Sequence, residues 1–249
     1  TTDAILATFH AAEAERRHSI LFVTGIPGAG KTLCGLNAVF GTGRAAGAVF
    51  LTGNPSLVHV LREALARDAA ATDPKGLRGA RQRMESAIQA LPLFRDENVS
   101  RTDPPHERVV VIDEAQRAWS AAHAITKSRD RRVRLTDSEP GHLLDIVGRH
   151  QGWAVIVCLI GNGQEIHTGE GGLAEWGTAL AARPHWQAIA APDALNAATD
   201  PRQRLPTLPG LRTDPSLHLA VPVRSLRNPH AAAWVDTVLA GDGAAAAAI

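Results

Sequence analysis

Runs of apolar, largely β-branched residues recur along the chain at lengths typical of buried strands. They cover residues 19–24 (SILFVT), 47–52 (GAVFLT), 108–113 (RVVVID) and 153–160 (WAVIVCLI). None of the four runs alternates between apolar and polar positions, which indicates strands that are covered on both faces. Strands of this kind are typical of α/β proteins, in which helices pack on either side of a sheet.

Between these runs, apolar residues recur at the three- and four-residue spacing of helices. The helical patterns span residues 31–40, 56–70, 76–91, 114–124 and 141–151. A further helix is predicted within residues 1–18, in front of the first strand. Because strands and helices alternate, the connections are crossovers and the sheet is parallel. We therefore predict an α/β fold with a doubly wound parallel sheet.

The stretch from residue 184 to residue 222 is rich in proline. Proline fixes φ and removes a backbone donor, so we predict a loop-rich connector there. A short strand is predicted at residues 216–221 (SLHLAV), near the end of this connector. A helix that begins at Asn228 and Pro229 is predicted for residues 228–240.

Composition adds few constraints. The chain has 249 residues, with 26 basic and 25 acidic side chains and a net charge of +1, so a site for a polyanion must be local. No apolar run approaches the roughly 20 residues of a membrane-spanning helix. Cys34 and Cys158 lie in apolar segments and suit a reducing compartment. We expect a soluble, cytoplasmic protein without a signal peptide. Because the sequence begins TTD and its one methionine is Met84, we also expect that part of the natural ends is missing.

The segment GIPGAGKT, residues 25–32, matches the phosphate-binding pattern G-x-x-x-x-G-K-[ST]. It lies between a predicted strand and a predicted helix, where backbone N–H groups and the positive end of the helix converge on an anion. An accidental glycine-rich turn is the alternative, and this context disfavours it. We expect Lys31 to reach the β- and γ-phosphates and Thr32 to bind Mg²⁺. The predicted nucleotide-binding residues are Gly25, Pro27, Gly28, Ala29, Gly30, Lys31 and Thr32.

A second candidate lies at the end of the third apolar run, in VVVIDEAQ. Asp113 is the predicted carboxylate for Mg²⁺, and Glu114 the predicted general base for the attacking water. The alternative is that DEAQ only starts a surface helix, with Asp113 as its N-cap. An acidic pair at the end of a strand favours an ATP hydrolase over a nucleotide kinase, because a kinase needs no base to activate water.

The chain resembles the Schlafen-like (group 3) DNA/RNA helicase domain family, a branch of the superfamily 1 P-loop NTPases. The segments that resemble the family cover most of residues 19–180. They are FLTGNPSLVHVLREAL, VIDEAQRAW (Walker B) and SEPGHLLDIVGRHQGWAVIVCLIGNGQEIHTGEGGLAEW, the third helicase motif with its flanks. The resemblance implies a RecA-like sheet with helices on both faces, and ATP with Mg²⁺ as cofactors.

Two further catalytic residues are predicted. Gln164, in LIGNGQEI, follows the fourth strand, which in RecA-like sheets lies between the strands that carry Lys31 and Asp113. An amide there can sense the γ-phosphate, and by resemblance Gln164 couples hydrolysis to the nucleic-acid groove. VPVRSLRNPHAAAWVDTVL resembles motif IV of the superfamily, which implies that Arg224 reaches the γ-phosphate, with Arg227 as a competing candidate.

A complete helicase of this type has a second RecA-like lobe, whose motifs do not occur in this sequence. We therefore predict an ATP-binding motor lobe in residues 1–185. Residues 186–249 would form a proline-rich connector and the start of an incomplete second lobe.

Nucleic-acid contacts are predicted less directly. By resemblance, Asn54 and Pro55 in GNPSLV lie on the track of a single strand of DNA or RNA. Basic side chains in KSRDRRVR would bind phosphates or form a solvated loop; they are Lys127, Arg129, Arg131, Arg132 and Arg134. Trp119, Trp153 and Trp176 are candidates for stacking on bases, although Trp153 begins a buried strand. Cysteine and histidine spacings predict no zinc site.

Two functions remain at this point. The first is an ATP-hydrolysing DNA/RNA helicase or translocase domain of the superfamily 1 type. The second is an ATP-dependent regulatory switch or defence-system ATPase, which controls a protein effector without unwinding nucleic acid. The near-neutral charge favours the switch, whereas the GNGQEI motif favours the motor.

Overall fold

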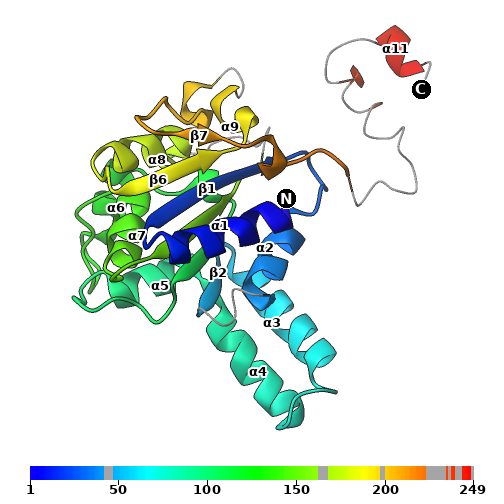
Figure 1. The fold of residues 1–249 in the computed structure, drawn as a ribbon, viewed down its shortest axis with the longest axis vertical. Coiled ribbons are helices and arrows are strands. Elements are labelled where there is room, and N and C mark those ends of the chain that lie inside the picture. The colour runs from blue at the N-terminus through cyan, green and yellow to red at the C-terminus, as the bar shows by residue number, and fades with distance from the viewer. Residues whose placement is uncertain are drawn as a thin grey trace.

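In the structure, a computed structural model, the described residues are 1–41, 47–161, 168–196, 200–222, 234, 237–238 and 243–247. Within them, an all-parallel sheet of eight strands forms the centre of the protein. Helices cover both faces of this sheet (Figure 1). The predicted α/β fold with a RecA-like, doubly wound parallel sheet is confirmed.

The order of the strands in the sheet differs from their order in the sequence. The path runs β3-β2-β4-β5-β1-β6-β7, and β8 pairs with β1. The position of β5 between β1 and β4 is the arrangement expected of a RecA-like sheet. The strands are β1 (His18–Gly25), β2 (Ala48–Thr52), β3 (Ile88–Ala90), β4 (Val109–Asp113), β5 (Ala154–Leu159), β6 (Trp186–Ala190), β7 (Arg212–Thr213) and β8 (His218–Leu219).

Helices connect the strands and form the two outer layers. The α-helices are α1 (Thr2–Ala14), α2 (Lys31–Phe40), α3 (Pro55–Ala69), α4 (Gly76–Ala87), α5 (Leu91–Asn98), α6 (Ala121–Ser128), α7 (Glu139–Gly148), α8 (Gly172–Ala181), α9 (Pro192–Asn196) and α11 (Gly243–Ala247). Short 3₁₀ turns are η2 (Ala115–Arg117), η3 (Pro201–Gln203) and η4 (Pro215–Leu217). None of the helices in the described part of the chain has both the length and the hydropathy needed to cross a bilayer.

The central strands are buried on both faces, as their continuous apolar runs predict. In β1, Ile20 and Phe22 belong to one core cluster, whereas Leu21 and Val23 belong to the other. All four side chains are fully buried. Because successive side chains of a strand point to opposite faces, β1 supplies both cores at once. Nearly every residue of such a strand must therefore be apolar.

Two predicted helices differ from the observed elements. The pattern at residues 76–91 ends as a helix at Ala87, after which Ile88–Ala90 forms β3 and a new helix begins at Leu91. Pro92 lies in the first turn of that helix, where its missing N–H costs little. The pattern at residues 114–124 is broken because Glu114 adopts the left-handed conformation, with φ of 55°, before η2 and α6.

The predicted loop-rich connector contains a strand that sequence analysis missed. Residues 186–190 form β6, which pairs in parallel with β1 between Pro184 and Pro192. Prolines at both sides therefore mark the ends of a five-residue strand. The predicted strand at residues 216–221 is present as β8. The sheet thus continues past residue 185, while the division into lobes at this point stays a prediction, and most of residues 228–240 lie outside the described residues.

Helices α3 and α4 form a hairpin that extends away from the sheet (Figure 1). They pack on each other through a small core of Ala66, Ala80 and Met84. At the base of the hairpin, Arg62 Nε donates to the carbonyl oxygen of Ile88 in β3 at 2.8 Å. The hairpin therefore has its own apolar core and a polar attachment to the sheet edge.

Helix α2 approaches the sheet closely at Gly35. A Cβ atom there would lie 2.7 Å from Leu159 Cδ1, 3.0 Å from Val111 Cγ1 and 3.1 Å from Phe50 Cε2. We expect Gly35→Val to lower the free energy of unfolding by about 2 to 3 kcal/mol, because its side chain overpacks the core. Urea denaturation measures the effect. The control Asn37→Val places the same residue on the exposed face of α2 and should change stability by about 0.5 kcal/mol or less. Equal stabilities of the two variants would contradict this packing.

Candidate functional site

The phosphate-binding motif forms a tight loop between β1 and α2. Gly28 and Gly30 have φ of 76° and 85°, in the left-handed region that residues with a β-carbon rarely adopt. Gly30 is the N-cap of α2, so the first N–H groups of this helix face the loop. The conformation that the motif predicts is present, and the loop offers unpaired helix donors to an anion.

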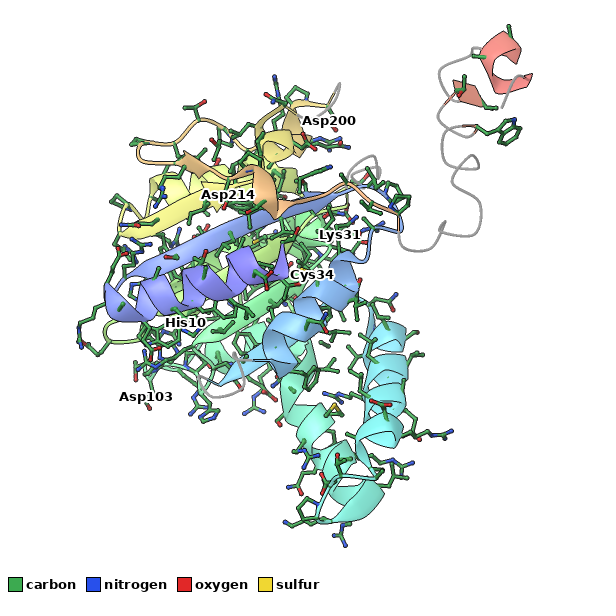
Figure 2. The ribbon with its side chains drawn as sticks, turned by 45° about the vertical axis from the view of Figure 1, so that its right-hand side comes forward. His10, Lys31, Cys34, Asp103, Asp200 and Asp214 are labelled. Carbon is green, nitrogen blue, oxygen red and sulfur yellow. The ribbon has the colours of Figure 1, made fainter. Side chains whose placement is uncertain are left out.

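Lys31 lies in the first turn of α2 and its side chain bends back over the loop (Figure 2). Its Nζ donates to the carbonyl oxygens of Gly25 and Ile26, at 2.7 and 3.2 Å. Burial lowers the pKa of this ammonium, and the charges of Glu114 and Asp113 act in the opposite direction. The positive charge is thus held beside the loop by neutral oxygens rather than by a direct ion pair.

Thr32 and Asp113 meet although 81 positions separate them in the sequence. Thr32 Oγ1 donates to Asp113 Oδ2 at 3.3 Å. Thr32 follows the loop after β1 and Asp113 ends β4, so both lie at the carboxyl edge of the sheet. A hydroxyl and a carboxylate oxygen are ligands of the type that Mg²⁺ prefers. The pair fits the predicted metal site in its chemistry.

Asp113 is buried and has a second carboxylate next to it. Desolvation and the charge of Glu114 raise the pKa of Asp113 to about 6, against smaller opposite contributions from Thr32 and Lys31. A cation bound here would offset this unfavourable charge. The side chain therefore lies where a metal ion would gain most from a carboxylate.

Glu114 is one of the non-glycine residues with positive φ, at φ 55° and ψ 44°. Its Oε2 accepts hydrogen bonds from Gln116 Nε2 at 2.8 Å and Arg117 Nε at 3.1 Å. The reading of Asp113 as the N-cap of a surface helix is wrong, since Glu114 occupies the N-cap of η2 and makes no side-chain cap. Strained residues of this kind cluster at functional sites.

Gln116 is a site residue that sequence analysis missed. Its side chain is buried, and its Oε1 accepts a hydrogen bond from the N–H of Gly161, just after β5, at 3.1 Å. Through Nε2 it also binds Glu114. Gln116 thus connects the turn after β4 with the turn after β5. Its place within the DEAQ motif is the signal from which it could have been predicted.

A cavity of about 730 Å³ opens beside these residues. Its walls include Thr32, Asp113 and Glu114, and also Asn54, the residue predicted to contact nucleic acid. Asn54 caps α3, because its Oδ1 accepts a hydrogen bond from the N–H of Leu57 at 3.2 Å. Pro55 follows as the first residue of that helix. The predicted metal ligands and two of the residues predicted to contact nucleic acid, Asn54 and Trp119, therefore share one cavity.

Other predicted residues lie elsewhere. Gln164, Arg224 and Arg227 lie outside the described residues. Arg132 and Arg134 line a different cavity, of about 590 Å³, beside α7. Among the described residues, no group of three or more His, Cys, Asp or Glu side chains is arranged to hold a metal ion. Arg132 and Arg134 of the basic cluster thus line a different cavity from that of Thr32 and Asp113.

Strand β8 lies directly against the start of the phosphate loop, a contact that sequence analysis did not predict. Leu219 pairs with Gly25 of β1, and its carbonyl oxygen accepts a hydrogen bond from the N–H of Ile26 at 3.1 Å. His218 Nδ1 lies 2.8 Å from Thr24 Oγ1 and 2.7 Å from Asp193 Oδ2. These contacts attach the segment around His218 to the start of the phosphate loop.

Comparison with known proteins gave one match. A protein-family model described as "Schlafen group 3, DNA/RNA helicase domain" matches residues 18–249. No curated protein and no solved structure matched the chain.

The pKa of Asp113 gives a stability prediction for the metal-free protein. The folded pKa of Asp113, about 6, exceeds the unfolded value, so ionisation of this carboxyl destabilises the folded state. The destabilisation grows as pH rises from about 4 to about 6 and is fully present above that window. We expect Asp113→Asn to raise the free energy of unfolding at pH 7.5 by about 2 kcal/mol, and by nothing below pH 4. Urea denaturation in EDTA across this range measures it. The exposed control Asp103→Asn should change stability little at any pH. A gain independent of pH would contradict the prediction.

Proposed function

The chain belongs to the Schlafen group 3 DNA/RNA helicase domain family, and we propose that it binds Mg-ATP and hydrolyses ATP as the motor lobe of a superfamily 1 type helicase or translocase. The observation that carries the proposal is the 3.3 Å contact between Thr32 and Asp113, which brings the phosphate loop and the acidic end of β4 to one point. Glu114 lies next to this contact and lines the same cavity as both residues.

The phosphate loop would bind the triphosphate through backbone N–H groups. Gly28 and Gly30 permit the close approach, and Lys31 would leave the carbonyl oxygens of Gly25 and Ile26 to contact the β- and γ-phosphates. Gly25, Pro27 and Ala29 complete the loop. Thr32 and Asp113 would hold Mg²⁺, which when bound neutralises charge on the phosphate oxygens.

Glu114 would accept a proton from the attacking water. Its carboxylate is oriented by Gln116 and Arg117, so the left-handed turn fixes the base at a defined place in the cavity. Gln116 also binds Gly161, which leads into the segment containing Gln164. This connection supports the proposed role of Gln164 in sensing the γ-phosphate. Arg224 remains proposed to reach the γ-phosphate, and the pairing of β8 with β1 beside Gly25, shortly before Arg224 in the sequence, supports this.

Single-stranded DNA or RNA is the proposed partner. The family description names both nucleic acids. Asn54, at the start of α3, shares the cavity with Glu114, so a strand bound there would lie close to the proposed base. The alternative partner is a protein effector, which the ATPase would control without unwinding nucleic acid.

Glu114→Gln separates binding from hydrolysis. We expect the variant to keep its affinity for Mg-ATP and to lose turnover by about 10²- to 10⁴-fold, because only the proton acceptor is removed. Lys31→Ala should lose both binding and turnover. Calorimetric titration and phosphate release measure the two quantities. The variant Glu63→Gln, at a half-buried position of α3 outside the proposed site, should keep normal turnover, and equally normal turnover in Glu114→Gln would exclude Glu114 as the base.

Single strands should stimulate the ATPase in a salt-dependent way. For about three phosphate contacts, a fourfold rise in salt weakens single-strand binding roughly 20-fold, because each counterion released into more concentrated salt gains less free energy. ATP turnover is measured with 20-nucleotide DNA or RNA at KCl concentrations from about 50 to about 200 mM, which is the ~fourfold rise in salt. Turnover that ignores both nucleic acids but responds to a protein would support the regulatory switch instead.

A further inference from the structure

Single strands are commonly bound by aromatic side chains on which bases stack. The structure separates four of the five tryptophans of the chain, Trp119, Trp153, Trp176 and Trp186, by their surroundings. Trp176 is fully buried and Trp186 is 6% exposed, so neither can meet a ligand. Trp153 precedes β5 and lies at the amino edge of the sheet, opposite the phosphate loop. Trp119 is half-buried and lines the cavity of Thr32, Asp113 and Glu114.

The indole of Trp119 is supported from one side by a buried cation. Arg95, 1% exposed, places its Cζ atom over the ring at 5.1 Å from the centroid. The ring of His123 meets the indole edge-on, with centroids 5.0 Å apart. A cation on one face leaves the opposite face for a second flat group. The side chain has the surroundings of a stacking surface.

Glu139 holds both the backbone of Trp119 and the cation beneath it. Its Oε2 accepts the N–H of Trp119 at 3.2 Å, and its own N–H donates to the Trp119 carbonyl oxygen at 3.0 Å. Its Oε1 accepts Arg95 Nη1 at 2.6 Å. Glu139 is itself buried in the first turn of α7. One carboxylate therefore fixes the position of the indole and of its support.

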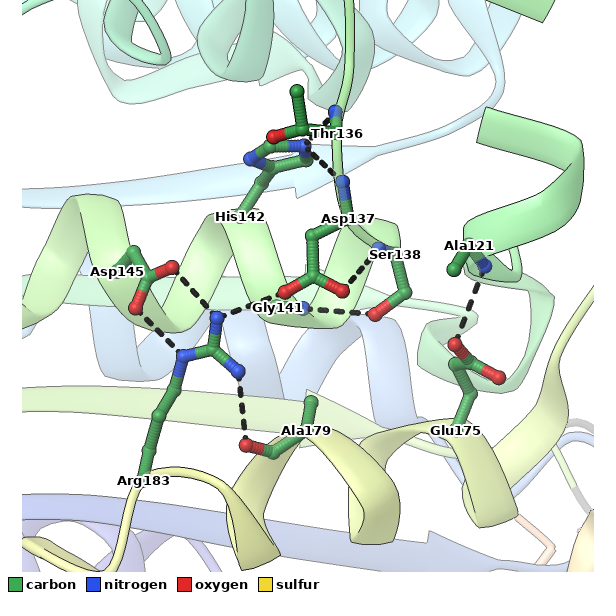
Figure 3. A network of polar contacts seen from close by, with 10 residues as sticks. All are labelled: Ala121, Thr136, Asp137, Ser138, Gly141, His142, Asp145, Glu175, Ala179 and Arg183. Atoms are coloured by element: carbon green, nitrogen blue, oxygen red, sulfur yellow. Dashed lines mark hydrogen bonds and ion pairs between the residues drawn. The ribbon is translucent and has the colours of Figure 1, made fainter. Parts of the chain in front are cut away.

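The first turn of α7 is fixed by a polar network (Figure 3). Ser138 caps the helix by accepting the N–H of Gly141 at 3.2 Å. Arg183, after α8, donates to Asp137 at 2.9 Å and to Asp145 at 2.6 Å. The network ties both ends of α7 to the segment after the neighbouring helix α8, so Glu139 is held on a fixed element.

The segment after residue 167 also holds the backbone at Trp119. Trp119 forms an antiparallel bridge with Glu170, and Ser120 N–H donates to the Gly169 carbonyl oxygen at 3.0 Å. Ala121 N–H donates to Glu175 Oε1 at 3.2 Å (Figure 3). The stretch that contains Trp119 is thus held by α7 and by the start of α8.

Only η2 lies between Trp119 and Glu114. This turn is closed by hydrogen bonds from Arg117 N–H to Glu114 O at 2.9 Å and from Ala118 N–H to Ala115 O at 3.3 Å. Trp176 Nε1 donates to Ala115 O at 2.9 Å and fixes the middle of the turn. Trp119 and Glu114 are therefore joined by a short, hydrogen-bonded turn.

The cavity itself favours a base over a phosphate. Its volume of about 730 Å³ lies in the range of small-ligand sites, about 300 to 1,000 Å³. Its apolar walls include Leu57, Leu61, Leu91 and Pro92. Among the described residues in its walls, the charged ones are Asp113, Glu114, Glu139, Glu170 and Arg117. These carboxylates disfavour a phosphate of the nucleic-acid backbone, which carries no Mg²⁺, unlike the phosphates of the proposed Mg-ATP, and the apolar wall favours a neutral, flat ring.

We propose that Trp119 is the stacking platform for a nucleobase of single-stranded nucleic acid. The proposal rests on the proposed function. The indole and the Asn54 side chain lie on walls of the same cavity, so a strand that contacts Asn54 can place one base on Trp119. The sugar-phosphate backbone then stays outside the acidic walls.

The test compares Trp119→Ala and Trp119→Phe with the wild-type protein and with the matched pair Trp153→Ala and Trp153→Phe. Trp153 is also half-buried and has an arginine, Arg108, 5.7 Å from its ring centroid, but it lies at the opposite edge of the sheet. Binding is measured by the fluorescence anisotropy of labelled oligo(dT) and oligo(U). We expect Trp119→Ala to bind about 5- to 150-fold more weakly. Trp119→Phe should recover most of the affinity, and both Trp153 variants should bind as the wild type does.

Quenching of tryptophan fluorescence gives a second readout that does not depend on the alanine variant folding. Binding of unlabelled oligo(dT) should quench the wild-type emission, and Trp119→Phe should lose this quenching while Trp153→Phe keeps it. Undiminished quenching in Trp119→Phe, or wild-type affinity in folded Trp119→Ala, overturns the platform and leaves the proposed function intact. If the wild-type protein binds neither oligonucleotide, the proposed nucleic-acid function fails as well.

Discussion

The contact between Thr32 and Asp113 depends on the order of strands in the sheet. With β5 between β1 and β4, the loop after one strand and the last residue of the other reach the same edge. This arrangement buries a carboxylate beside Glu114 and raises its pKa to about 6, a cost in stability that the apolar strands on both sides must offset. The remaining features of the site, from the bent Lys31 to the turn after β4, are arranged around that buried acid.

Much of the fold follows from patterns within the sequence. Uninterrupted apolar strands and the glycine-lysine loop each depend on local chemistry, so residues 18–25, 48–52, 109–113 and 154–159 are strands close to where the runs predict them. The meeting of Thr32 and Asp113 was also predictable, because parallel strands of known order present their carboxyl ends together.

Other features depend on long-range contacts that no local pattern records. The five residues of β6 form a strand because β1 offers an unpaired edge, and proline content alone predicted a loop. The left-handed backbone of Glu114 breaks a helical pattern that continues in the sequence. Gln116 and Trp119 bind partners 45 and 20 residues away, respectively, so the sequence offered Trp119 only as one of three candidates for stacking and did not single out Gln116.

The pairing of β8 with β1 has a consequence for how the protein is made. Thr24 and His218 are 194 positions apart, so the brace on the phosphate loop is among the most distant contacts in the chain. Such contacts form late, because closing a long loop costs entropy before the contact returns any energy. A chain still emerging from the ribosome therefore carries its phosphate loop without that brace until the segment around His218 has been synthesised.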